Sequence, residues 1–249
     1  MPPARRSAHP PAATGGSAGN QLAHHHSSAC IHTDQIKQRL RTAVINQIRG
    51  LLLERGITLP KGRSHLEEAL PEIPADAHTR FSECIFVLLV QVRTELDQLS
   101  GRIEEMDALI ARTSKENDAC RRLTTIPGVG PVTATALVSA IGNGSAFRKG
   151  RDLAAWVGMV PREHSTGGKL LGISKRGNHY LRRLFVQCSR SIIRFRDKPG
   201  APFGALLKQL MGHAHHNVAV VALANKLLRI AWAVLFKNEL CRGSVLTAV

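Results

Sequence analysis

Residues 126–131, which read Ile-Pro-Gly-Val-Gly-Pro, restrict the backbone more than any other stretch of this chain. Gly128 and Gly130 permit positive φ and a close approach to another surface, while Pro131 suits the first turn of a helix. Residues 132–141 are therefore predicted to form a short helix that ends at the next glycine. A turn of this kind points N–H groups outward and is typical of a helix-hairpin-helix that binds nucleic-acid backbone. The alternative is a tight helical pair that only packs.

A second segment, residues 161–178, is rich in glycine and polar residues, so a loop without helix or strand is predicted there. Asn178 is predicted to cap the helix that follows. The apolar stripe of that helix comprises Leu181, Leu184, Phe185, Cys188 and Ile192, and arginines recur on another face at 183, 190 and 194. A run of charge is usually a solvated face, but beside a phosphate-type turn it favours a nucleic-acid surface.

The net charge of +16 is unevenly distributed. Residues 123–249 contain 18 Lys and Arg but four acids, whereas residues 34–122 contain 14 of each. A surface that binds polyanions is therefore expected in the C-terminal half. The four acids are scattered, which excludes a two-metal nuclease site within residues 123–249, because such a site needs converging carboxylates. Any chemistry on phosphodiesters in this half requires another nucleophile.

The five cysteines are widely spaced and form no C-x-x-C pair, which predicts reduced thiols in a cytoplasmic protein instead of disulfides or zinc. The histidines at 24–26 and 213–216 lack carboxylate or cysteine partners, so we expect solvated loops and no metal or other cofactor in this chain. The N-terminal residues contain no apolar h-region, so no signal peptide is predicted. Residues 218–236 are apolar but contain Lys226 and Arg229, which predicts a buried helix and no membrane span.

The sequence predicts a mostly α-helical protein in three parts: a disordered tail at 1–33, a helical arm at 34–122 and a basic domain at 123–249. The first arm helix has one apolar face, formed by Ile36, Leu40, Val44, Ile48 and Leu51. A long coiled-coil-like helix follows, with a nearly heptad series comprising Phe81, Ile85, Leu88, Val92, Leu96, Leu99, Ile103, Met106 and Ile110. Such a helix pairs either with the 34–55 helix folding back or with another subunit. The second alternative predicts a homo-oligomer through 81–110. Two further helices, at 203–210 and 217–236, are expected to complete the basic domain.

Six blocks of the sequence together resemble the C-terminal domain of the DEDD-type insertion-sequence transposases, whose recombinases are guided by a bridge RNA. In order, they are LTTIPGVGP (123–131), LAAWVGMVP (153–161), HSTGGK (164–169), GISKRG (172–177), YLRR (180–183) and NVAVVALANK (217–226). The arm also resembles the middle region of that family. The resemblance therefore extends over residues 34–240.

This resemblance implies DNA recombination by a transposase. In the family, an N-terminal RuvC-like domain holds Mg²⁺ with an acidic tetrad, and the C-terminal domain supplies a serine nucleophile. Residues 1–33 match none of the RuvC-like domain, so the expectation is a truncated copy that needs a partner for activity. Ser165 is the expected nucleophile and Thr166 the alternative one. DNA and a guide RNA are the implied partners.

The residues expected to contact phosphates are two glycines, Gly128 and Gly130, and a set of cations: Arg148, Lys149, Arg162, Lys169, Lys175, Arg176, Arg182 and Arg183. The hypothesis from a different functional class is a non-catalytic module that binds DNA or RNA. The Ser165 loop distinguishes the two hypotheses, since a module that only binds does not need a positioned hydroxyl.

Overall fold

The structure is a computed structural model that describes residues 18–69, 82–163, 170–198 and 200–241. Its elements are α1 (Ala18–Leu53), α2 (Arg63–Ala69), α4 (Glu83–Glu116), α5 (Asp118–Thr124), α6 (Pro131–Ile141), α7 (Gly150–Val157), β1 (Pro161–Glu163), β2 (Leu170–Ile173), α8 (His179–Arg194), α9 (Gly204–His213) and α10 (His216–Lys237). The chain is mostly helical, as predicted. It forms two compact units, one spanning Ala29–Leu109 and one that includes Ile110–Val249.

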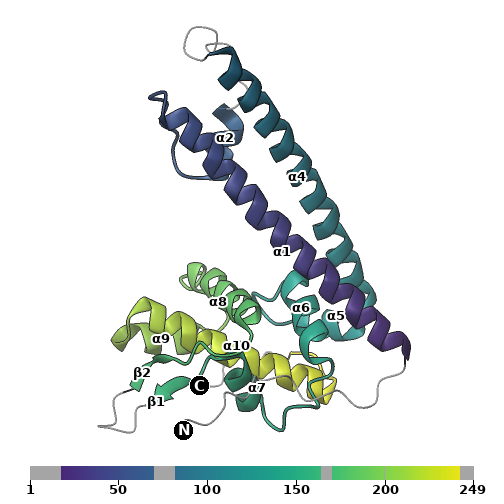
Figure 1. Cartoon of the computed structure of the whole chain (residues 1–249). Coiled ribbons are helices and arrows are strands. Elements are labelled where there is room, and N and C mark those ends of the chain that lie inside the picture. Colours follow the sequence, from purple (N-terminus) through teal and green to yellow (C-terminus); the bar gives the residue numbers. More distant parts are fainter. Residues whose placement is uncertain (1–17, 70–81, 164–169, 199, 242–249) are drawn as a thin grey trace, which may run out of the picture. The chain divides into compact units, whose positions relative to one another are not determined.

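The first unit is a helical hairpin in which α1 and α4 lie side by side with α2 near one end (Figure 1). Its core comprises Val44, Ile48 and Leu52 of α1, Leu66 of α2, and Leu89, Val92, Leu96 and Leu99 of α4. The Arg49 guanidinium donates to the carbonyl oxygens of Pro60 and Gly62, which fixes the segment between α1 and α2. The long helix therefore pairs with the preceding helix of the same chain, one of the two predicted alternatives. Its coiled-coil character stays a prediction.

The buried faces of this hairpin differ in register from the predicted ones. Leu52 is fully buried where Leu51 was predicted, and Leu89 is buried whereas Leu88 is 37% exposed. The side chains of adjacent helical residues point about 100° apart. Apolar residues spaced by three and four positions therefore allow either of two neighbours to face the core, and the position of the partner helix decides which one does.

The beginning of α1 also departs from expectation. The helix starts at Ala18, inside the segment predicted to be disordered, and residues 1–17 lie outside the described part of the chain. Ile36 and Leu40, predicted to belong to the apolar face, are about half exposed.

The second unit is organised around α10, which contacts α5, α7, α8 and α9. Its fully buried residues include Leu223, Ala224, Leu227, Leu228 and Ala231. The helix α6 packs against α5 and α8. This compact unit begins at Ile110 instead of 123, because α5 packs on α6 and α10.

Of the described residues, α10 alone is long and apolar enough to pass a length-and-composition test for a membrane span. Its contacts with four neighbouring helices bury the apolar face, and a core helix of this kind passes the same test. Its apolar composition is therefore explained by packing.

Two local predictions are confirmed. The helix α6 begins at Pro131 and ends at Ile141, with Gly142 as its C-cap. The side chain of Asn178 accepts a hydrogen bond from Leu181 N at 3.0 Å, and the stripe on α8 is buried at Leu181, Phe185, Cys188 and Ile192.

The prediction of a strandless loop at 161–178 is wrong at its two flanks. There β1 and β2 form an antiparallel pair, with Arg162 opposite Leu171 and Glu163 opposite Leu170. A further bond from Ser174 N to Val160 O, at 2.9 Å, extends the pairing. The backbone N–H and C=O groups of the two flanks satisfy one another. The Gly-rich, polar composition of the segment does not reveal this pairing.

Candidate nucleic-acid interface

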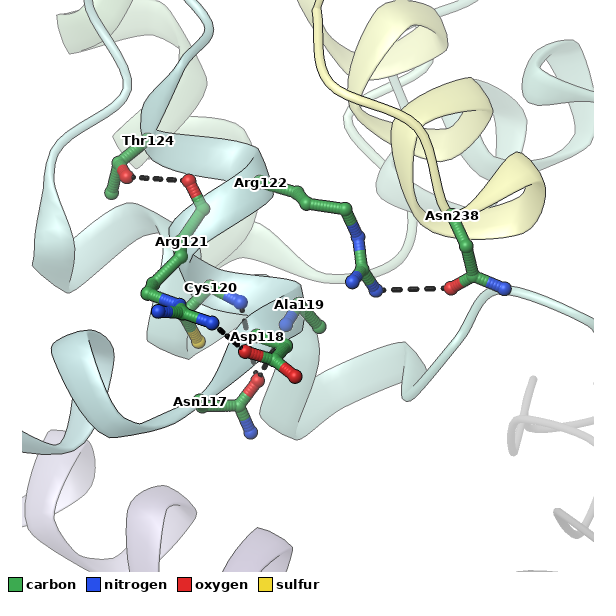
Figure 2. Close-up of polar contacts among 8 residues, drawn as sticks. All are labelled: Asn117, Asp118, Ala119, Cys120, Arg121, Arg122, Thr124 and Asn238. Carbon is green, nitrogen blue, oxygen red and sulfur yellow. Dashed lines mark hydrogen bonds and ion pairs between the residues drawn. The ribbon is translucent and has the colours of Figure 1, made fainter.

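The helix α5 is capped at its start, and the turn between α5 and α6 is closed by a backbone hydrogen bond of its own. Asn117 caps α5, and its Oδ1 accepts from the N–H groups of Ala119 and Cys120 at 2.9 and 3.2 Å (Figure 2). Within the turn, Val129 N donates to Ile126 O at 3.0 Å, and both of these side chains are buried. The turn is thus anchored by its two apolar side chains, which leaves its glycines at the surface.

The two glycines of this turn have different surroundings. Gly128 has φ +78°, and a Cβ added there would lie 2.8 Å from Ile192 Cγ1 and 3.0 Å from Cys188 O of α8. Gly130 has φ −93° and ψ 176°, and a Cβ there would meet no heavy atom within 4 Å. Gly128 therefore allows the turn to pack on α8, whereas Gly130, the N-cap of α6, faces open space where an anion has room to bind.

The chain that follows α10 is tied to α5 and the turn. Figure 2 shows the Arg122 side chain reaching the end of α10, where its Nη2 donates to Asn238 Oδ1 at 2.9 Å. Cys241 N donates to Thr125 Oγ1 at 3.1 Å. Asn238 adopts φ +56°, a left-handed conformation that asparagine tolerates at a helix end. These contacts hold residues 238–241 against the helical domain.

The segment after α7 and the segment before α8 interlock through their glycines. A Cβ on Gly158 would lie 1.8 Å from Arg176 O, and one on Gly177 would lie 1.8 Å from Trp156 O. Lys175 N donates to Gly158 O at 3.1 Å, which holds Lys175 at φ +55°. Two backbones this close leave no room for side chains between them, so both glycines are required by packing.

Arg182 joins the same two segments from α8. Its Nη1 donates to Val157 O at 2.8 Å and to Arg176 O at 3.5 Å. Asn225 of α10 adds a bond from its Nδ2 to Met159 O at 3.0 Å. The guanidinium of Arg182 therefore positions the loop that carries Lys175 and Arg176.

The remaining predicted cations in the described residues are exposed. Lys175 and Arg176 lie between β2 and α8, Arg183 lies on α8 over the Tyr180 ring at 5.6 Å, and Arg162 lies on β1. Arg148 and Lys149 precede α7 instead, at the opposite end of α7 from Gly158. The structure thus groups Lys175, Arg176 and Arg182 and places Arg148 and Lys149 elsewhere.

Three predicted site residues, Ser165, Thr166 and Lys169, lie outside the described residues. The strands that flank them are paired, with Glu163 opposite Leu170. Among the residues that the structure describes, no group of three or more His, Cys, Asp or Glu side chains is arranged to hold a metal ion.

Cys84, Cys120, Cys188 and Cys241 are free thiols, and Cys120 and Cys188 are buried in the second unit. Burial raises the pKa of Cys120 to about 11, and burial also raises the pKa of Cys188, whose Sγ lies 3.5 Å from Thr133 Oγ1. Both thiols are therefore neutral at physiological pH and pack as small apolar groups.

A basic groove between α7 and α10 was missed by sequence reasoning. It has a volume of about 790 Å³, and its charged lining comprises Lys149, Arg151, Lys226, Arg229, Lys237 and Glu239. The available signal is the i, i+3 pair Lys226 and Arg229 inside an otherwise apolar helix, which argues against a membrane span and also places two cations near one another. Its partner residues on α7 lie far away in sequence.

Comparison with known proteins shows which family this chain is similar to. Residues 120–203 match the profile of the Transposase IS116/IS110/IS902 family. This stretch runs from α5 to the start of α9 and includes the turn, the interlocked segments and α8. The part of the basic helical unit between α5 and the N-cap of α9 is therefore similar to a domain of insertion-sequence transposases.

Individual relatives are similar over most of this chain. It is 38% identical over 213 residues to the transposase for insertion sequence element IS1111A of Coxiella burnetii, covering 84% of this chain and 58% of the relative. It is 37% identical over 206 residues to a probable family 20 transposase of Pseudomonas aeruginosa, covering 82% and 61%. For the transposase of IS1328 from Yersinia enterocolitica the identity is 36% over 198 residues, covering 79% and 58%. The chain thus spans about 60% of the length of these curated relatives.

Proposed function

We propose that this chain binds DNA as part of an insertion-sequence transposase and takes part in DNA transposition. The observation that carries the proposal is that the transposase profile, residues 120–203, falls in the half of the chain that holds 18 Lys and Arg against four acids. A domain with this excess of positive charge attracts phosphate backbones irrespective of their base sequence.

In this proposal the α5–α6 turn acts as a helix-hairpin-helix. The open N-cap at Gly130 and the positive end of α6 receive a phosphate, supported by the absence of any neighbour within 4 Å of a Cβ there. Gly128 contributes its N–H at the same turn. Exposed cations at Lys175, Arg176 and Arg183 extend the contacts along the backbone.

The catalytic proposal places Ser165 as nucleophile, with Thr166 as the alternative. The hydroxyl oxygen forms a bond to a backbone phosphorus, and the bond from phosphorus to one bridging oxygen breaks. The hydroxyl proton passes to solvent, and the leaving oxygen takes a proton from solvent to become a hydroxyl group. Arg162, Lys169, Lys175 and Arg176 stabilise the extra charge at phosphorus. Mg²⁺ belongs, in this proposal, to the acidic tetrad of the family's RuvC-like domain, which residues 34–240 do not resemble.

We also propose that the chain forms a homo-oligomer through the 81–110 helix. Val87 and Val90 of α4 are 49% and 46% exposed, so the hairpin retains apolar surface after α1 has packed on it. A guide RNA, as in the family that the sequence resembles, is the proposed second nucleic acid.

The binding proposal is tested by fluorescence anisotropy of a labelled 30-base-pair duplex with the whole chain. Six to ten phosphate contacts predict that affinity falls by about 10³–10⁵ between 50 and 200 mM salt. An affinity that stays constant across this range contradicts the proposal.

The catalytic proposal is tested by joining this chain to the part of the Coxiella burnetii relative that lies outside the matched 58% of its length. Covalent protein–DNA adducts are then compared for Ser165→Ala and Thr166→Ala. Loss of adducts in Ser165→Ala alone supports the serine, and loss in Thr166→Ala alone transfers the role to the threonine. Strong DNA binding without adducts in the unsubstituted protein favours the alternative, a non-catalytic binding module.

A further inference from the structure

The groove between α7 and α10 is bounded by elements that the structure fixes in place. A Cβ on Gly150 would lie 3.1 Å from Arg229 Cα, so the start of α7 abuts the α10 backbone. Lys149 N donates to Asp152 Oδ2 at 3.1 Å, which orders the first turn of α7. The opposite wall, formed by residues 239–241, is held by the Cys241–Thr125 hydrogen bond. The groove is therefore formed by segments whose positions the fold of the second unit fixes.

The groove concentrates positive charge. Three of its cations, Lys149, Arg151 and Arg229, are exposed and converge where α7 meets α10. The acids near this point are Glu239, which lines the groove, and Asp152, whose carboxylate accepts from Lys149 N. Lys149 and Arg151 flank Gly150, which abuts the backbone of Arg229. The three like charges repel one another, and an anionic ligand relieves that repulsion.

Lys226 is affected by the same crowding. Burial and the neighbouring Arg229 both lower its pKa, and its Nζ lies 5.7 Å from the Phe203 ring centroid. The ring of buried Phe203 thus lies beside the ammonium group of Lys226, which also lines the groove. The cations of the groove therefore include one half-buried lysine.

An aromatic pair lies along the same helix. Trp232 lines the groove, and its Nε1 donates to Gly144 O at 3.1 Å, which fixes the indole ring. Phe236 stacks on Trp232 with ring centroids 4.9 Å apart and an interplanar angle of 14°, and it is 50% exposed. An exposed ring supported from behind by a second ring is a platform on which a further planar group can stack.

We propose that this groove binds an unpaired nucleic-acid strand, with its phosphates on Lys149, Arg151 and Arg229 and a base stacked on Phe236. A cationic groove beside an aromatic platform is the combination that proteins use for single strands. A single strand can enter a recess and turn a base outward, whereas the bases of a duplex are stacked inside it. The inference rests on the proposed function, in that the ligand is a nucleic acid, but it assigns a site separate from the α5–α6 turn.

The test compares two triple variants that remove equal charge. The groove variant carries Lys149→Gln, Arg151→Gln and Arg229→Gln, all at exposed positions. The control carries Arg39→Gln, Arg55→Gln and Arg102→Gln, which are exposed on the helical hairpin. Binding of a fluorescein-labelled 12-nucleotide single-stranded DNA and of the matching duplex is measured for both variants and the unsubstituted chain between 50 and 200 mM salt.

The groove variant is expected to bind the single strand about 10- to 100-fold more weakly than the control. Its salt slope is expected to be about two smaller, since each lost contact to a single strand removes about 0.7. Phe236→Ala is expected to weaken single-strand binding by roughly 5- to 100-fold, and Phe236→Tyr, which keeps the ring, is expected to leave it unchanged.

Two results overturn the inference while the proposed function stands: a groove variant that binds the single strand as tightly as the control, or one that loses affinity only for the duplex. Absence of salt-dependent binding to either oligonucleotide by the unsubstituted chain overturns the proposed function itself. As a second readout, the single strand is expected to protect Lys149 and Lys237 from acetylation, with Lys61 of the hairpin as the unprotected reference. Acetylation at equal rates with and without the strand contradicts the assignment.

Discussion

Replacing Gly130 with aspartate is expected to change stability and nucleic-acid binding in opposite directions. Gly130 is the N-cap of α6, and its φ and ψ of −93° and 176° lie in the region that capping residues adopt. No heavy atom lies within 4 Å of an added Cβ, so a side chain fits without strain. An aspartate there can accept the Thr133 N–H and place a negative charge at the positive end of the helix dipole.

The stabilising effect is small. A cap bond that replaces glycine contributes a few tenths of a kcal/mol, and the dipole interaction adds about 0.3–1 kcal/mol. Together these raise the free energy of unfolding by about 0.5–1 kcal/mol, or roughly 1–4 °C in Tm for a domain of this size. Differential scanning fluorimetry measures the shift. Gly130→Asn is the matched control, because it supplies the same cap without the charge.

The effect on binding is larger and of opposite sign. Two like charges about 4 Å apart repel by roughly 1 kcal/mol in water and about 4 kcal/mol near a protein surface. A carboxylate at the position of a bound phosphate is therefore expected to weaken DNA binding about 10-fold or more. The salt slope is expected to fall by about one, since one phosphate contact is lost. Equal affinities of the aspartate and asparagine variants for duplex DNA would show that no phosphate binds at the α6 N-terminus.

Three further perturbations follow from the packing of the same unit. Arg182→Ala removes the bonds to Val157 O and Arg176 O and is expected to lower the free energy of unfolding by about 1–3 kcal/mol in urea titrations, whereas exposed Arg183→Ala stays within about 0.5 kcal/mol. Gly158→Ala combines φ +80° with a Cβ 1.8 Å from Arg176 O, so a loss of more than about 2 kcal/mol is expected, and a normal melting temperature would contradict the interlock. Burial raises the pKa of Cys120 to about 11, so the folded state favours the neutral thiol. The stability that this thiol contributes is complete at pH values below the pKa of an unfolded thiol, about 8.5. The free energy of unfolding then falls as pH rises to 11, by at most roughly 3 kcal/mol. Cys120→Ser, which has no thiol to ionise, removes this part of the alkaline loss, and identical pH profiles of the two proteins would refute it.

Local chemistry made several elements predictable from sequence. Pro131 and Gly142 bound α6, and Asn178 caps α8, because each signal acts on backbone groups within a few residues of itself. The buried stripe of α8 follows from a 3.6-residue period that one helix imposes on its own side chains. The basic character of the C-terminal half needs only a count of charges.

Other features depend on contacts between segments that are not adjacent in the chain. The choice of Leu89 over Leu88 depends on where α1 lies against α4, and the pairing of β1 with β2 depends on two flanks meeting across an intervening segment. Arg182 also has a role that its charge does not reveal: it was predicted to contact phosphates, and in the fold its guanidinium donates to two backbone carbonyls. DNA contact by this residue stays a prediction.

The groove also combines residues that the sequence shows with an arrangement that only the fold determines. Each of its cations is visible in the sequence, but Lys149 and Arg151 are separated from Arg229 by most of the domain. They meet because Gly150, which has no side chain, allows the start of α7 to touch the α10 backbone. Charge and helical period are properties of residues and their near neighbours, so they can be read along the chain. A binding site is formed by residues brought together in space, and the close packing of helices decides which ones meet.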